Sequence, residues 1–399
     1  MIAKLAWRNI WFKPLNTALS VLLLASSVAI ITLLILLQKQ FEEQFSSNAD
    51  DIDLVLGAQG SPLQLVLSSV YQVDAPTGNI NYDSAKVWMR HPFVHKAIPL
   101  AFGDNYLGYK IVGTTPDYLE KFGSKIIQGK MFEKNMEVVL GAVIAQKLNL
   151  KIGDTFHGTH GEAKEGEKHE EFEYKVSGIA SPTGKVVDNL VLSNIESVWQ
   201  MHENHDGGNE LHAHEEEPKE ITSVLLKFRN KMAIMTWPRM IAQNTKMQAV
   251  SPAIEINRLF TLFGVGLKTL EYLAYGIMLI SGVSIFIALY NRLKERKYEF
   301  ALLRLQGASR LQMFILVLLE SMFLCVLGFC FGTIIGRFAL EMLSNASEND
   351  FKIGFNPFEV IWEKEGLLLI VTLLLGVISA LLPAIKAYTM NISKTLANG

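Results

Sequence analysis

The sequence has very little cysteine. Only two of its 399 residues are cysteine, Cys325 and Cys330, and both lie inside one apolar run. No disulfide framework is therefore available to the polar part of the chain. Both cysteines are far from any histidine, and no serine is framed by glycines as in hydrolases. A nucleophilic enzyme is not indicated.

The sequence also lacks a nucleotide-binding loop. No G-x-x-x-x-G-K-[ST] string occurs, and the nearest one, 161–168, breaks the pattern. Without backbone amides that cradle phosphates, nucleotide chemistry has no place here. The net charge is −2, so no global basic field points to nucleic acid. Half of the residues are apolar and 19% are charged, which favours membrane helices combined with a soluble domain.

Four apolar runs are long enough to cross about 30 Å of hydrocarbon. A cleavable signal peptide is the alternative for the first run. That run is too long, however, and the polar segment 38–44 separates it from the small residues at 47–49. We therefore predict a multi-pass membrane protein with four transmembrane helices. The predicted spans are 14–38, 268–290, 311–336 and 366–389.

Lysine and arginine are concentrated on one side of these spans. The loop 291–310 and the first thirteen residues are rich in basic residues, whereas the loop 337–365 is mainly acidic. The positive-inside rule then places both termini, including the tail 390–399, in the cytoplasm. The segment 39–267 is predicted to be extracytoplasmic.

Residues 1–13 contain two pairs of residues at helical spacing, one aromatic and one basic. Trp7 and Trp11 lie four apart, and so do Lys4 and Arg8. This pattern suits a short helix in the cytoplasmic interface, with its aromatic rings at headgroup level. The alternative is a positively charged lead-in to the first span.

The segment 39–267 is predicted as one α+β domain of mixed topology in two lobes. Runs rich in β-branched residues alternate with short helical patterns bounded by Gly, Pro or Asp. Ser251 and Pro252 form an N-cap and first helical position, so a helix is expected to run from there into span two as a stalk. The predicted strands are 110–113, 137–141, 174–179 and 222–228, and the predicted helices are 116–122 and 142–148.

Within this domain, residues 157–220 form a histidine-rich insertion. Pairs of histidines at short spacings can share a metal ion, and imidazole suits Zn²⁺. The alternative is a solvated insertion, which its Gly, Glu and Lys content also favours. No H-E-x-x-H signature occurs. The candidate ligands are His157 and His160, His202 and His205, and His212 and His214.

Two features lie inside the third span. Glu320 is about ten residues into it, where an ionisable group is costly. We expect either a polar latch within the helix bundle or a carboxylate solvated near the cytoplasmic face. Gly328, Gly332 and Gly336 are four apart and form a smooth strip for close helix approach. The neighbour is span four or another subunit, with packing inside the chain favoured.

The loop 291–310 carries a specific motif directly after a basic cluster, E-x-A-x-x-R-x-x-G-A-S, and Glu320 follows it in the next span. It resembles the signature of FtsX-like permeases of the MacB superfamily. The ending 382–384 looks like that family's ending, and 138–154 resembles its MacB-like periplasmic core domain. The matching loop residues are Glu299, Ala301, Arg304, Gly307, Ala308 and Ser309.

The resemblance implies the membrane subunit of a type VII ABC transporter in the bacterial inner membrane. This chain would be no enzyme and would bind no cofactor, because ATP and Mg²⁺ belong to two partner ATPase subunits. The loop would be a coupling helix, and ATP-driven closure would be transmitted to the outer domain. A homodimer or a heterodimer with a second permease is expected, with a periplasmic adaptor or lipoprotein as a further partner.

Three functions stay open from the sequence. The favoured one is export or extraction of a lipoprotein, peptide or amphiphile. The second is a zinc-linked transport or sensing system that uses the histidine-rich region. The third is FtsX-like regulation of cell-wall hydrolases, for which the outer domain looks too large.

Overall fold

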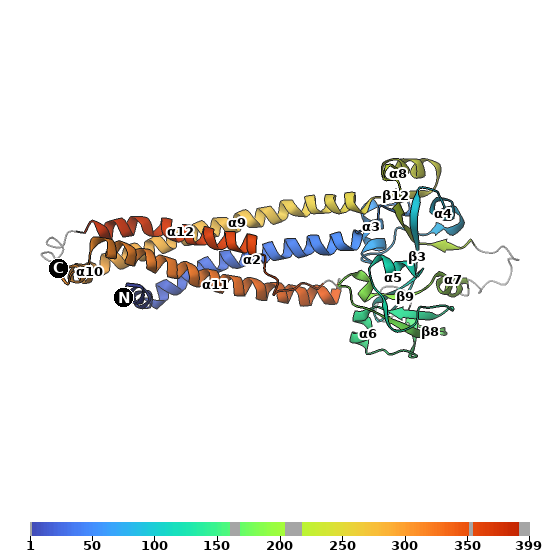
Figure 1. Ribbon diagram of the computed structural model, residues 1–399, viewed down its shortest axis with the longest axis horizontal. Coiled ribbons are helices and arrows are strands. Elements are labelled where there is room, and N and C mark those ends of the chain that lie inside the picture. Colours follow the sequence, from blue (N-terminus) through green and yellow to red (C-terminus); the bar gives the residue numbers. More distant parts are fainter. Residues whose placement is uncertain (1, 160–167, 204–217, 351–353, 391–399) are drawn as a thin grey trace. The chain divides into compact units, whose positions relative to one another are not determined.

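The computed structural model describes residues 2–159, 168–203, 218–350 and 354–390, and the chain divides into two compact units. We call 1–41 together with 262–399 the membrane unit, and 42–261 the α/β domain. The predicted fold class, four membrane helices with an α+β domain, is confirmed (Figure 1).

Four helices in the described part of the chain are long and apolar enough to cross a membrane. A span needs about 20 residues, so the helices of 36, 44 and 41 residues extend well past any hydrocarbon layer. The extension of α9 is the stalk expected from the pattern at Ser251 and Pro252. The helices of this unit are α1 (Ile2–Ile10), α2 (Pro14–Ala49), α9 (Pro252–Glu295), α10 (Lys297–Leu305), α11 (Arg310–Asp350) and α12 (Trp362–Tyr388).

The third long helix differs from the sequence expectation. The segment 337–365 was predicted as a loop, but α11 continues through its first half. Leu340 is fully buried, and Arg337 donates to Glu365 at 2.7 and 2.8 Å and to the carbonyls of Pro357 and Glu359. These hydrogen bonds hold the acidic segment against α11. The charges of this segment alone do not predict that arrangement.

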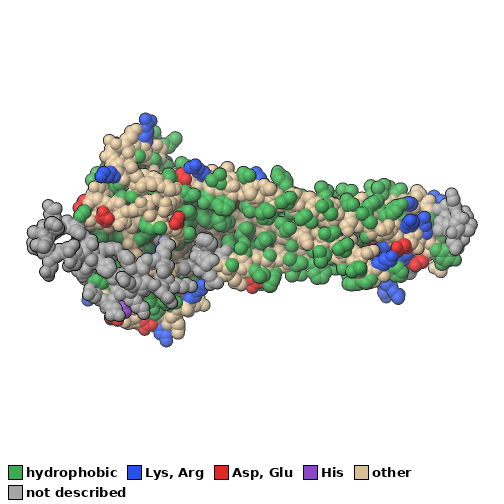
Figure 2. Space-filling view, turned by 180° about the vertical axis from the view of Figure 1, so that it is seen from behind, with side chains coloured by type: hydrophobic (Ala, Val, Ile, Leu, Met, Phe, Trp, Pro, Cys, Tyr) green, Lys and Arg blue, Asp and Glu red, His purple; other side chains and the backbone are tan. Residues whose placement is uncertain are grey.

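The surface of the membrane unit is largely apolar. Figure 2 shows hydrophobic side chains covering its visible face, with Lys and Arg side chains gathered near the end that carries α10. Leu270, Leu279 and Ile370 are 49%, 65% and 56% exposed. Exposed leucine and isoleucine over whole helices fit contact with lipid rather than water.

The α/β domain is built on a mixed sheet. In the described residues it has ten strands in the order β12-β1-β11-β3-β4-β9-β6-β8-β5, with β7 paired to β3 and β8. Pairing is antiparallel except for β4 with β9 and β6 with β8. The strands are β1 (Leu54–Ala58), β3 (Val94–Tyr106), β4 (Tyr109–Thr114), β5 (Ile126–Gly129), β6 (Glu137–Leu140), β7 (Thr155–Thr159), β8 (Lys168–Ala180), β9 (Val191–Asn194), β11 (Ser223–Phe228) and β12 (Met247–Val250), and the separate pair β2 (Ile80–Asn81) and β10 (Glu220–Ile221).

Short helices cover this sheet. Side chains cap two of them: Ser61 accepts from Gln64 N at 3.4 Å, and Asn81 accepts from Ser84 N at 2.9 Å. The helices are α3 (Pro62–Val70), α4 (Tyr82–Met89), α5 (Asp117–Lys121), α6 (Ala142–Leu148), the 3₁₀ helix η1 (Val186–Asn189), α7 (Ile195–Glu203) and α8 (Met232–Asn244).

The hydrophobic core of the domain has two centres although the sheet is continuous. One gathers around Trp237, Leu54 and Val224, and the other around Tyr174, Val138 and Ile111. The two lobes expected from the sequence therefore correspond to two cores that share one sheet.

Candidate functional site

Helix α10 is a separate element between two spanning helices. It ends in a Schellman motif: Gly307 N donates to the carbonyl of Arg304 at 3.2 Å, and Ala308 N donates to that of Leu303 at 3.1 Å. Gly307 has φ +102°, a conformation that glycine adopts without a Cβ penalty. The glycine of the motif thus stops α10 before α11 begins.

Ser309 starts the next helix. Its Oγ accepts from Gln312 N at 3.2 Å, while Gln312 Oε1 accepts from Ser309 N at 2.8 Å. This reciprocal pair is a capping box. The last three residues of the motif, Gly307 to Ser309, therefore act through backbone geometry at the turn.

The inner face of α10 is fixed to the membrane unit. Ala301 is fully buried and Phe300 is 5% exposed, and Phe300 packs in a cluster with Ala6, Leu293 and Met313. This apolar cluster anchors α10 on its inner face.

The two charged motif residues have different environments. Glu299 is half-exposed and forms an ion pair with Arg296 at 2.5 Å. Arg304 turns inward, where Nη1 donates to the carbonyl of Met390 at 3.2 Å. The exposed part of Glu299 is therefore accessible to a partner, although Arg296 already pairs with it, whereas Arg304 ties α10 to the segment that follows α12.

An apolar outer face on α10 was not singled out from the sequence. Tyr298, Leu302 and Leu305 are 52%, 39% and 61% exposed. Their i, i+4, i+7 spacing puts them on one side of the helix. The spacing is visible in the sequence, but the charged residues Glu299 and Arg304 lie between these positions and obscure the apolar pattern.

Helix α1 packs on α11 through one face, while Trp7 and Trp11 are 43% and 57% exposed. Glu320 is buried at 4% exposure and accepts a hydrogen bond from Asn9 Nδ2 at 2.6 Å. The carboxylate therefore lies inside the bundle and is not solvated. A second contact, Arg292 Nη2 to Thr17 Oγ1 at 2.5 Å, links α9 to α2.

The glycine strip of α11 faces span one of the same chain rather than span four. A Cβ added to Gly328 would lie 2.6 Å from Leu24, one on Gly332 2.6 Å from Val28, and one on Gly336 2.7 Å from the carbonyl of Ala29. The strip lets α2 and α11 approach closely.

Of the candidate metal ligands, only the side chain of His157 lies in the described part of the chain. Its Nδ1 is 3.1 Å from the carbonyl oxygen of Phe172. The side chains of His160, His202, His205, His212 and His214 lie outside the described residues. Among the residues that the structure describes, no group of three or more His, Cys, Asp or Glu is placed to hold a metal ion.

Comparisons with known proteins match both units. Residues 17–232 match the model of the MacB-like periplasmic core domain, and residues 272–392 match that of the FtsX-like permease C-terminal region. An uncharacterized ABC transporter permease of Methanocaldococcus jannaschii is 22% identical over 294 residues, which are 72% of this chain and 69% of that protein.

Two solved structures are similar to part of the chain. The periplasmic region of MacB from Actinobacillus actinomycetemcomitans has a TM-score of 0.35 and 13% identity, covering 52% of this chain and 94% of that one. The extracellular domain of the noncanonic ABC-type transporter YknZ from Gram-positive bacteria has a TM-score of 0.32 and 10% identity, covering 50% and 99%.

Proposed function

The chain belongs to the family of ABC transporter permeases with a MacB-like periplasmic core domain and an FtsX-like C-terminal region, and from this premise we propose that it couples a separate ABC ATPase to movement of its α/β domain. The ATPase binds and hydrolyses ATP, and the permease chain transmits the resulting conformational change from the ATPase to the α/β domain. The observation that carries this proposal is the form of α10: anchored on its inner face and apolar on its outer face.

The outer face of α10 is suited to a protein partner. Three large apolar side chains, Tyr298, Leu302 and Leu305, lie beside the exposed carboxylate of Glu299. An apolar centre with a polar rim is the usual composition of a stable interface. Because Phe300 and Ala301 fix α10 to the bundle, force applied to this face passes into α11 and α12.

The membrane arrangement follows the positive-inside rule. On this proposal α10, α1 and the end of α12 are cytoplasmic, and the α/β domain lies on the outer side of a bacterial inner membrane. Two permease subunits, identical or different, work with two ATPase subunits. An adaptor or lipoprotein binds on the outer side.

The substrate class proposed is a lipoprotein, peptide or amphiphile, exported or extracted from the outer leaflet. Glu320 and Asn9 contribute a buried polar contact that holds α1 against α11 while the helices move. A zinc-linked system and regulation of cell-wall hydrolases are the alternatives. The zinc alternative depends mainly on histidines outside the described residues.

Substitution of Leu305 by Asp tests the docking face. Burying a leucine at an interface stabilises it by about 1.5–3 kcal/mol, so an aspartate there should weaken ATPase association roughly 10- to 100-fold. Glu299→Lys, which reverses an exposed charge, should weaken it less. The readout is the amount of ABC ATPase that co-purifies with the tagged chain, and the ATP hydrolysis of the purified complex.

Two further variants make the test specific. Val87→Asp replaces an apolar residue that is 70% exposed on α4 of the α/β domain, and it should leave ATPase association unchanged. Arg304→Glu is a poor test because it breaks the contact with Met390 inside the chain. Normal ATPase association and activity in Leu305→Asp would show that α10 is not the coupling element.

A further inference from the structure

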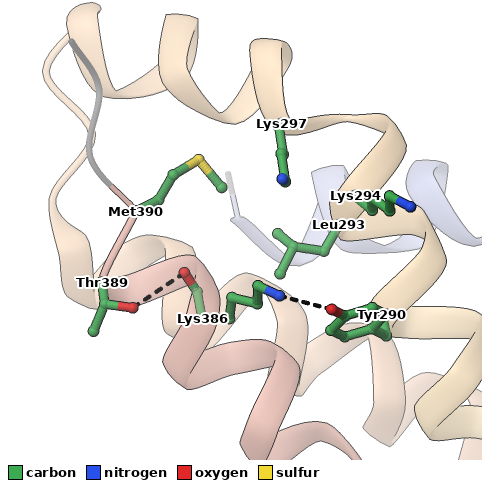
Figure 3. A pocket seen from close by; sticks show the side chains of 7 residues that line it. All are labelled: Tyr290, Leu293, Lys294, Lys297, Lys386, Thr389 and Met390. Carbon is green, nitrogen blue, oxygen red and sulfur yellow. Dashed lines mark hydrogen bonds between the residues drawn. The ribbon is translucent and has the colours of Figure 1, made fainter. Parts of the chain in front are cut away.

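A basic pocket lies at the end of the membrane unit that carries α10. It has a volume of about 320 Å³ and is formed where α9, α10 and α12 meet (Figure 3). Lys294 and Lys297 come from the end of α9 and the start of α10, and Lys386 from the last turns of α12. Tyr290, Leu293, Thr389 and Met390 complete its lining.

The positive charge of this pocket is not neutralised by its own lining. Lys386 donates to the hydroxyl of Tyr290 at 2.7 Å, and its ammonium lies 4.4 Å from the centre of that ring. Within the described part of the chain, Lys294 and Lys297 make no ion pair, and Figure 3 shows Lys297 extending toward the middle of the recess. Three lysines therefore line one small space, with the ammonium groups of Lys297 and Lys386 turned toward it and that of Lys294 turned to its side (Figure 3).

The acidic residues nearby in sequence are engaged elsewhere. Glu295 pairs with Lys13 at 2.6 Å, and Glu299 pairs with Arg296 at 2.5 Å. The positive-inside rule explains why basic residues are abundant at this end, but it does not explain why three of them line the same pocket. A bound anion would lower the repulsion among the three lysines.

The helix faces that lead to the pocket are apolar. Ile287 is 50% exposed and lies one turn before Tyr290 on α9, and Leu382 is 66% exposed one turn before Lys386 on α12. Leu293 and Met390 give the pocket an apolar wall. A ligand with a phosphate head and an apolar tail would contact both kinds of surface.

We propose that this pocket binds the phosphate group of an anionic phospholipid at the membrane interface, with Lys294, Lys297 and Lys386 as its cationic partners. Basic pockets between membrane helices bind anionic headgroups in this way. The lipid would fill the space beside α10 and so fix the angle at which that helix leaves α9. On the topology proposed above, the lipid belongs to the cytoplasmic leaflet, but its binding does not depend on any ATPase.

Native mass spectrometry of the full chain in detergent tests the proposal, with dioleoylphosphatidylglycerol and dioleoylphosphatidylcholine as probes. Phosphatidylglycerol should bind more tightly than phosphatidylcholine. Two lysines near a headgroup contribute enough that the double variant Lys294→Gln/Lys297→Gln should bind it roughly 10- to 30-fold more weakly. Lys268→Gln/Lys364→Gln changes two exposed lysines, in the first half of α9 and the first turn of α12, and should bind as the wild type does.

Two additional arms separate the possible outcomes. Lys294→Arg/Lys297→Arg keeps both charges and should restore binding, which distinguishes a ligand site from a folding defect. An excess of inorganic phosphate should not displace the lipid. Equal phosphatidylglycerol binding in the two Gln double variants would overturn the proposal, and displacement by inorganic phosphate would assign the pocket to free phosphate instead.

Discussion

Lys121 is an unusual residue of the α/β domain because its ammonium is largely buried. It donates a hydrogen bond to the carbonyl of Asn48, and it lies 3.7 Å from the centre of the Phe122 ring. Burial lowers the pKa of Lys121 to about 7, and the charge of Lys185 acts in the same direction. Asp50 and Asp51 oppose this shift but do not cancel it.

The stability of the region around Lys121 should therefore depend on pH. Between pH 7 and the ordinary lysine pKa of 10.5, the unfolded state holds a proton that the folded state has lost. The free energy of unfolding then rises with pH in this window, by at most about 1.4 kcal/mol per pH unit. Below pH 7 both states are protonated and this contribution is flat.

Hydrogen exchange of the full chain measures this effect. Protection of segments 44–50 and 117–122 should increase from pH 7 to pH 9 in the wild type relative to Lys121→Met at the same pH. Lys125→Met, which changes an exposed lysine, should keep the wild-type dependence. Identical pH slopes for the wild type and Lys121→Met would show that the buried ammonium does not titrate there.

Close packing of α2 on α11 depends on glycine, and Gly332→Leu should disrupt it. A side chain at Gly332 meets the Cβ of Val28 at 2.6 Å, so overpacking should lower the free energy of unfolding by about 1–3 kcal/mol. Gly276→Leu on α9 is the control, because a Cβ there has no neighbour within 4 Å. Both variants gain the same helix propensity, so their difference in thermal unfolding in detergent isolates the contact.

If Gly332→Leu unfolds at the same temperature as Gly276→Leu, the two helices are not in close contact at this point. The strip itself could be predicted from the spacing of its glycines, but its neighbour could not. Small-residue spacing identifies a surface that permits close approach, whereas the choice between α2 and α12 is made by the packing of whole helices.

Elements whose boundaries are marked by short local sequence patterns could be predicted from the sequence. Helix α6 has the bounds 142–148 that were predicted for it, and α9 begins at Pro252 directly after Ser251, as the predicted cap requires. Strand β3 and helix α8 were not predicted. Pro99 and Gly103 interrupt the strand pattern of β3, and Pro238 lies inside α8, so tertiary packing rather than local propensity decides both.

For the motif of the candidate site, likewise, the local helix could be predicted from the sequence, whereas the contacts of its side chains could not. The resemblance predicted a coupling helix within the loop 291–310, and α10 lies there and ends just before Gly307. The direction of each side chain was not predictable, because Arg304 could equally face a partner or the carbonyl of Met390. Buried partners such as Asn9 for Glu320 are 311 positions away in sequence, so no local pattern joins them.

The orientation of the whole molecule in the membrane decides whether α10 can reach an ATPase, and cysteine labelling tests it. In a background with Cys330, which is exposed, replaced by Ala, Lys294→Cys should resist a membrane-impermeant maleimide until the inner membrane is opened. Val87→Cys, on the α/β domain, should react in intact cells once the outer membrane is permeable. The physical reason is the basic bias of loop 291–310. Reaction of Lys294→Cys from outside would put α10 and the basic pocket on the wrong side for an ATPase, and the proposed coupling would fail even though the family assignment would remain.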